Sequence, residues 1–287
     1  MLASFLITFR EALEAALIIG IIASYVAKIG RKDLNRYIKI GVAGALMASF
    51  VVAMIFKTVY GELSGKAEQL FEGTAALTAA IVLTYMIFWM ANNSRQIKGE
   101  VQEKIDLSIS KGQVFGIAAL SFIAVFREGV ETVLFLGALS ITDPVDTILG
   151  FFIGLAVVIA LSFIMFKGIF RLDVSKFFKY TRFMLILFSA GLVATSVHEF
   201  NEQGIIPEGI THVWDMNPAL NPDGIYPPLH ENGLIGGSLK ALIGYNSDPS
   251  LTEVLAYFGY WIIIATFVHK NFKTGAEVKN GSGYPQD

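Results

Sequence analysis

Long apolar stretches separated by shorter polar segments dominate the pattern of this chain. Seven of them approach or exceed the roughly 20 residues that an α-helix needs to cross a bilayer. They cover residues 2–27, 38–60, 69–91, 113–140, 146–168, 181–200 and 252–270. The pattern therefore predicts an all-α integral membrane protein with seven transmembrane helices.

Composition supports a membrane protein and excludes cysteine chemistry. The chain is 54% hydrophobic and only 16% charged, whereas soluble domains carry about 25% charged residues. It contains no cysteine, which excludes disulfides, thiolate metal sites and a cysteine nucleophile. The first apolar stretch lacks a preceding basic region and contains charged residues, so we expect a retained helix rather than a signal peptide.

The basic residues alternate between the two sides of the predicted membrane. Of the 22 Lys and Arg, 17 lie after the first, third and fifth apolar stretches or in the C-terminal tail. Basic loops favour the cytoplasmic side. We therefore expect a multi-pass protein of the inner or plasma membrane, with the N-terminus outside and the C-terminus in the cytoplasm.

A six-residue motif occurs twice, each time inside an apolar stretch. Phe9-Arg10-Glu11-Ala12-Leu13-Glu14 returns 117 residues later as Phe126-Arg127-Glu128-Gly129-Val130-Glu131. Each copy begins a set of three spans, and three is odd, so the second set enters the membrane from the opposite side. This is the plan of transporters built from inverted repeats, whose site lies between the repeats. Chance similarity over a short motif is the alternative.

The repeat divides the chain into six segments. We expect two inverted three-helix repeats, a loop on each side of the membrane, a seventh helix outside the repeat, and a tail. In chain order these are the first repeat 1–91, the cytoplasmic loop 92–112, the second repeat 113–202, the exterior loop 203–250, the seventh helix 251–270 and the cytoplasmic tail 271–287.

The motif places charges where lipid is expected. Each charged side chain near the bilayer centre costs at least roughly 2.5–3.5 kcal/mol. Residues turn by about 100° along a helix, so each motif presents its three charges on one face. These are Arg10, Glu11 and Glu14 in the first copy and Arg127, Glu128 and Glu131 in the second. If the faces meet, four carboxylates surround two guanidinium groups.

Such a cluster predicts a cation site. Each arginine would balance charge and keep at least one carboxylate ionised, and the carboxylates left over would bind a hard cation. One-turn spacing favours Arg10 with Glu14 and Arg127 with Glu131, while pairing between the repeats stays open. A structural ion-pair network that joins two helices is the alternative.

Other candidate residues lie toward the predicted outer surface. Glu72, His198, Glu199 and Glu202 could form an outer site that admits the metal, or could simply cap helix ends. Methionines occur in pairs at helical spacing, which more often indicates packing than metal binding. These pairs are Met47 with Met54 and Met86 with Met90. The long exterior segment also predicts an interfacial helix over 232–245.

The chain resembles the oxidase-dependent iron permease family, which includes fungal high-affinity iron permeases and bacterial iron-uptake permeases. The resemblance rests first on Arg10-Glu11-x-x-Glu14 and Arg127-Glu128-x-x-Glu131. It extends to the third span, from Phe71-Glu72-Gly73 through Thr84-Tyr85-Met86 and Trp89-Met90, and to the ending of the sixth from Gly191 to His198-Glu199. It implies iron import, with the motif glutamates in iron translocation. It also implies an exterior partner that oxidises or binds iron: a multicopper oxidase in fungi, a haem peroxidase and a periplasmic iron-binding protein in many bacteria.

We therefore predict a high-affinity importer of Fe³⁺ and/or Fe²⁺ rather than an enzyme. Iron is then the transported substrate, with no tightly bound cofactor and no nucleic-acid partner, and the protein contacts membrane lipid. An oligomer stays open. Transport of another cation, such as Mn²⁺ or Pb²⁺, is the first alternative. A membrane di-iron enzyme is the second, although such sites usually use Glu-x-x-His pairs and both motifs here are Glu-x-x-Glu.

Overall fold

The structure is a computed structural model that describes residues 1–93, 97–110, 114–142, 144–166, 174–216, 226–227, 230 and 233–281. All regular structure in these residues is helical. The helices are α1 (Leu2–Lys28), a short 3₁₀ helix η1 (Lys32–Leu34), α2 (Asn35–Gly61), α3 (Lys66–Asn93), α4 (Ile97–Ser110), α5 (Phe115–Thr142), α6 (Pro144–Phe166), α7 (Val174–Glu202), α8 (Leu234–Ile243) and α9 (Leu251–Gly281).

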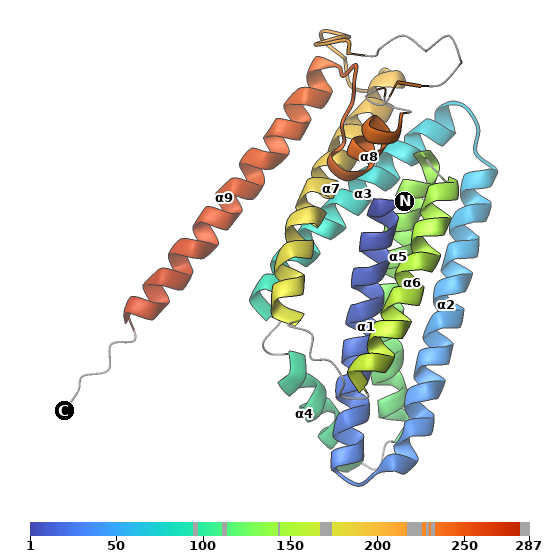
Figure 1. Cartoon of the computed structure of the whole chain (residues 1–287), viewed down its shortest axis with the longest axis vertical. Helices are drawn as coiled ribbons and strands as arrows, with labels where there is room; N and C mark the ends of the chain where they lie inside the picture. Colours follow the sequence, from blue (N-terminus) through green and yellow to red (C-terminus); the bar gives the residue numbers. More distant parts are fainter. Residues whose placement is uncertain are drawn as a thin grey trace.

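The long helices form an interleaved bundle. Helix α2 packs along α5, α6 packs along α1, and α3 packs along α7. Helices α1 and α5 also touch each other and run in opposite directions (Figure 1). Helix α9 contacts α7 and diverges from the bundle toward its C-terminal end. The closest partners of α1 and α5 are therefore helices that lie far away in the sequence.

Length and hydropathy identify four of the described helices as candidate membrane spans, in α2, α3, α6 and α7. Helices α1 and α5 are equally long, but each carries one arginine and two glutamates in its middle. The outer faces of α2 and α6 expose large apolar side chains, such as Met47, Phe50, Phe152 and Ile159. Faces of this kind suit lipid rather than water, so the chain is a multi-pass membrane protein.

Glycines allow the closest helix contacts. A Cβ atom on Gly41 of α2 would lie 2.3 Å from the Ala118 carbonyl oxygen of α5. A Cβ atom on Gly150 of α6 would lie 2.5 Å from the Met1 carbonyl oxygen and 2.1 Å from Ser4 Oγ of α1. Both helix pairs therefore pack backbone against backbone, which small residues permit within membranes.

The segment 92–112, expected to be a loop, contains the helix α4. Lysine and glutamate residues lower its hydropathy, and this conceals its amphipathic pattern. The helix is stabilised because Val101 and Ile105 pack against the C-terminal end of α1 and the N-terminal end of α5. The Tyr25 hydroxyl of α1 also donates a 2.7 Å hydrogen bond to Asp106.

The remaining boundaries shift by several residues. The interfacial helix expected over 232–245 corresponds to α8, which is shorter. Helix α7 begins at Val174, before the expected 181, and α9 continues to Gly281 rather than ending at 270. In α7 and α9 the helix continues past its apolar stretch into charged residues. Hydropathy therefore marks only the part of these two helices that suits lipid.

Candidate functional site

The two motifs meet at the contact between α1 and α5. Arg10, Glu11 and Glu14 are 3%, 0% and 4% exposed, and Glu128 is 2% exposed. Each motif is short enough to fit on one helix face, and the antiparallel contact turns the two faces toward each other. Charged groups so deeply buried need specific partners.

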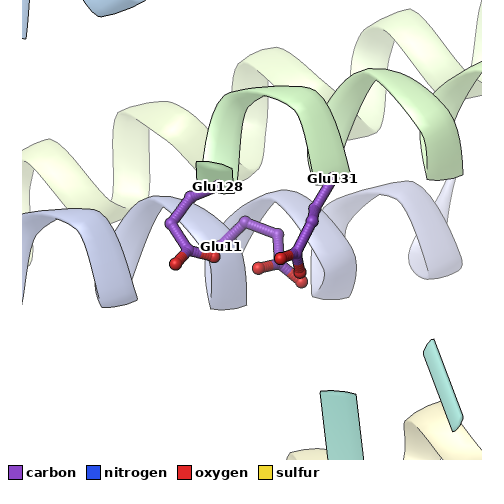
Figure 2. A group of neighbouring side chains, drawn as sticks. All are labelled: Glu11, Glu128 and Glu131. Atoms are coloured by element: carbon purple, nitrogen blue, oxygen red, sulfur yellow. The ribbon is translucent and has the colours of Figure 1, made fainter. Parts of the chain in front are cut away.

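Three carboxylates converge between these helices. Figure 2 shows Glu11 extending from α1 and Glu128 and Glu131 from α5. One oxygen from each lies within 4.8 Å of the other two. The Oε2 atom of each of these side chains is buried and has no hydrogen-bond partner among the described residues. Oxygens spaced in this way match the ligand set that a hard or borderline divalent cation takes.

Each arginine binds the two glutamates of its own motif. Arg10 pairs with Glu11 through Nη1 and with Glu14 through Nη2, the second contact at 2.9 Å. Arg127 pairs with Glu128 at 2.6 Å and lies 3.6 Å from Glu131. The sequence spacing favours Glu14 for Arg10 and Glu131 for Arg127, and both pairs are present. Each arginine also pairs with the glutamate that follows it directly, and in the second motif this adjacent glutamate is the closer partner.

Helix α3 adds two residues that the sequence did not identify as part of the site. The sulfur of Met86 lies 3.3 Å from Nη1 of Arg10, and the guanidinium of Arg127 lies 5.2 Å from the ring centroid of Trp89. The two α3 residues are three positions apart and share a helix face. The methionine spacing favours packing over metal binding, and only the position of α3 relative to the motifs identifies this contact. The Met90 side chain lies outside the described side chains.

The two halves of the site differ in exposure. The side chain of Arg10 is 4% exposed and that of Arg127 is 41% exposed. Glu131 is also more open than its counterpart Glu14, at 14% against 5%. The α1 half of the site is therefore more deeply buried within the bundle than the α5 half.

The residues of the candidate outer site lie near the N-terminal end of α3 and the C-terminal end of α7, where they contact several different partners. The Tyr60 hydroxyl donates a 2.7 Å hydrogen bond to Glu72, and His198 Nε2 lies 3.4 Å from Glu202. The Glu199 side chain lies near Gly73, where a Cβ atom would come within 3.2 Å of it. The four residues are near one another, but the compact carboxylate group of the described chain is the one between α1 and α5.

Glu253 is not among the candidate site residues that the sequence predicts. The structure buries it to 4% exposure at the start of α9. It lies 3.2 Å from His198 and accepts a 2.8 Å hydrogen bond from Asn246, so it ties α7 to α9. In the segment between α7 and α9, a hydrogen bond with Asp248 raises the pKa of the exposed His212 imidazole.

The whole bundle is similar to known iron permeases. The model of the Iron permease FTR1 family matches residues 1–271. The ferrous iron permease EfeU of Yersinia pestis is 34% identical over 265 residues, which cover 91% of each chain. The protein of the same name from Escherichia coli O6:H1 is 34% identical over 268 residues, covering 91% of this chain and 93% of its own.

An uncharacterized protein of Archaeoglobus fulgidus is also 34% identical, over 95% of this chain and 96% of its own length. No solved structure matches the chain. Since the family match spans nearly the whole chain, this protein belongs to the iron permease FTR1 family and is an iron-transporting permease rather than an enzyme.

Proposed function

We propose that this protein imports ferrous iron, and that iron crosses the membrane through the carboxylates of Glu11, Glu128 and Glu131. The observation that carries the proposal is the convergence of these three groups within 4.8 Å, each with one unpaired buried oxygen. The relatives named ferrous iron permeases favour Fe²⁺ over Fe³⁺.

The charges of the site suit a cation that binds and leaves. The four motif glutamates exceed the two motif arginines by two negative charges when all are ionised. A divalent cation would therefore bring the cluster to neutrality, and Arg10 and Arg127 would balance the carboxylates while the cation is absent. An inside-negative potential favours inward movement by roughly 2.3 kcal/mol per charge per 100 mV.

The packing also supports two inverted repeats within a seven-span protein. A shift of 117 residues relates Met1, Ser4 and Phe5 of α1 to Ala118, Ser121 and Phe122 of α5. The first set lies against Gly150 and the second against Gly41. The stacked rings of Phe5 and Phe9 likewise match those of Phe122 and Phe126, with centroid distances of 5.8 and 5.3 Å.

We place the N-terminus and the cluster of Glu72, His198, Glu199 and Glu202 on the outer side of the inner or plasma membrane. Cations would reach the site after this acidic surface concentrates them. An exterior protein that oxidises or binds iron is the partner that fits this side.

Radio-iron accumulation in cells without their own iron importers tests the function. We expect cells that produce the wild-type protein to accumulate iron and cells that produce Glu128→Gln to lose most of this uptake. The substitution keeps the shape of the side chain but removes the charge from the middle of the site. Membrane levels of the two proteins must match.

The control variant is Glu103→Gln, because Glu103 is an exposed carboxylate on α4 far from the motifs. It should transport like the wild type. Equal uptake by Glu128→Gln and the wild type would reduce the motif to a structural ion pair. If unlabelled Mn²⁺ competed better than unlabelled Fe²⁺, the substrate assignment would be wrong.

A further inference from the structure

A single nitrogen atom at the site is shared by an oxygen and a sulfur. Nη1 of Arg10 is paired with Glu11 Oε1 and lies 3.3 Å from the sulfur of Met86. Met86 is 4% exposed and belongs to the apolar core formed mainly by α3, α5 and α7. Its thioether therefore reaches from this core to the edge of the carboxylate group, on the side occupied by a positive charge.

Carboxylates alone would not distinguish iron from the more abundant divalent cations. Oxygen ligands suit Mg²⁺, Ca²⁺ and Mn²⁺, whereas thioether sulfur prefers softer metals. Fe²⁺ is softer than Mg²⁺ or Ca²⁺ and accepts both kinds of ligand. A sulfur beside three carboxylates would therefore favour Fe²⁺ over the alkaline-earth cations.

We propose that Met86 is a further ligand of the transported cation and the residue that sets selectivity for Fe²⁺ over Mg²⁺ and Ca²⁺. This inference rests on the proposed function of the carboxylate site. Nη1 of Arg10 carries positive charge and contacts both the Met86 sulfur and Glu11 Oε1. A cation would take that place and bind the same two atoms.

Arg10 has a second partner that makes this exchange feasible. Its Nη2 lies 2.9 Å from Glu14 Oε1, so the guanidinium can release Glu11 while it stays paired with Glu14. The arginine keeps its proton throughout, and only the partner of Glu11 and Met86 changes. Glu14 thus acts as a positioning residue for Arg10, and Glu11 and Met86 contact the cation.

X-ray absorption on the purified wild-type protein, loaded with Fe²⁺ without oxygen, tests the sulfur ligand directly. We expect a shell of one sulfur around iron. It should disappear in Met86→Leu, which preserves the size and apolar character of the side chain. The matched control is Met47→Leu, because Met47 is 72% exposed on α2, and this variant should keep the shell.

Uptake measures the selectivity. We expect Met86→Leu to import iron, with excess Mg²⁺ or Ca²⁺ inhibiting at concentrations at least about ten-fold lower than for the wild type. Absence of sulfur around iron in the wild-type protein would overturn the proposal without any variant, as would unchanged inhibition in a folded Met86→Leu protein. Absence of iron uptake by the wild type would instead contradict the proposed function.

Discussion

The two motif arginines have the same sequence neighbours but different surroundings. Arg10 is buried between Glu11, Glu14 and the sulfur of Met86, whereas the side chain of Arg127 is 41% exposed and lies against Trp89. A guanidinium removed from a buried cluster leaves its carboxylates without compensation. At an exposed position the loss of the guanidinium costs less stability, because the carboxylates there are less completely desolvated.

Arg10→Gln should therefore destabilise the protein more than Arg127→Gln. We expect the loss of the buried partner at Arg10 to cost about 3–5 kcal/mol and the loss at Arg127 to cost clearly less. Thermal unfolding in detergent, measured as a shift in the midpoint, checks the order of the two variants.

A second substitution tests the cause. Arg10→Gln combined with Glu14→Gln removes both charges of one pair and should recover part of the lost stability, as coupled neighbours do. Equal midpoints for the two single arginine variants would show that burial does not control their contribution.

The residue types of the site could be predicted from the sequence, but the full set of contacts could not. Charges at Arg10, Glu11 and Glu14 stand out because lipid penalises them, and their repetition identifies the partner helix. Met86 and Glu253 carry no such signal, since methionine is common in apolar helices and an acidic residue is common near the membrane surface. Their roles depend on which helices pack together.

At the level of helices, hydropathy finds the long apolar elements and misses the short charged helix α4. The spans in α2 and α6 agree well with the structure because their outer faces need lipid along the whole length. Helix α4 is stabilised by Val101 and Ile105 packed against other helices, and two buried residues in a charged segment give too weak a pattern. The packing of α2 on α5 is likewise invisible in any local window.

Gly41→Ala tests that packing. The added Cβ would lie 2.3 Å from the Ala118 carbonyl oxygen, so α2 and α5 must separate at a cost of about 1–3 kcal/mol. We expect a lower unfolding midpoint and less protein in the membrane. The control is Gly61→Ala at the end of the same helix, where nothing lies within 4 Å of the added atom. A similar loss in both variants would mean that the effect comes from the helix itself rather than from its contact.

For the whole molecule, the proposed orientation can be measured with unusually little background because the chain has no cysteine. We expect Lys66→Cys, at the start of α3, to react with a membrane-impermeant maleimide in intact cells. Lys32→Cys, between α1 and α2, should react only after the membrane is opened. Both lysines are exposed, so a difference in labelling reports the side of the membrane. The reverse pattern would invert the topology.

The interleaved packing of α1 has a consequence for how the protein is made. Its main partners, α5 and α6, follow roughly a hundred residues later, and the two motifs are 117 residues apart. At a synthesis rate of roughly 5–20 residues per second, α1 waits about 6–23 s for the helix that completes its charged face. During that time its arginine and glutamates face the insertion machinery or water at the membrane surface rather than lipid. We therefore expect α1 to settle in the membrane only once α5 has been made, and a chain that stops after α3 to lack both helices that cover the charged face of α1.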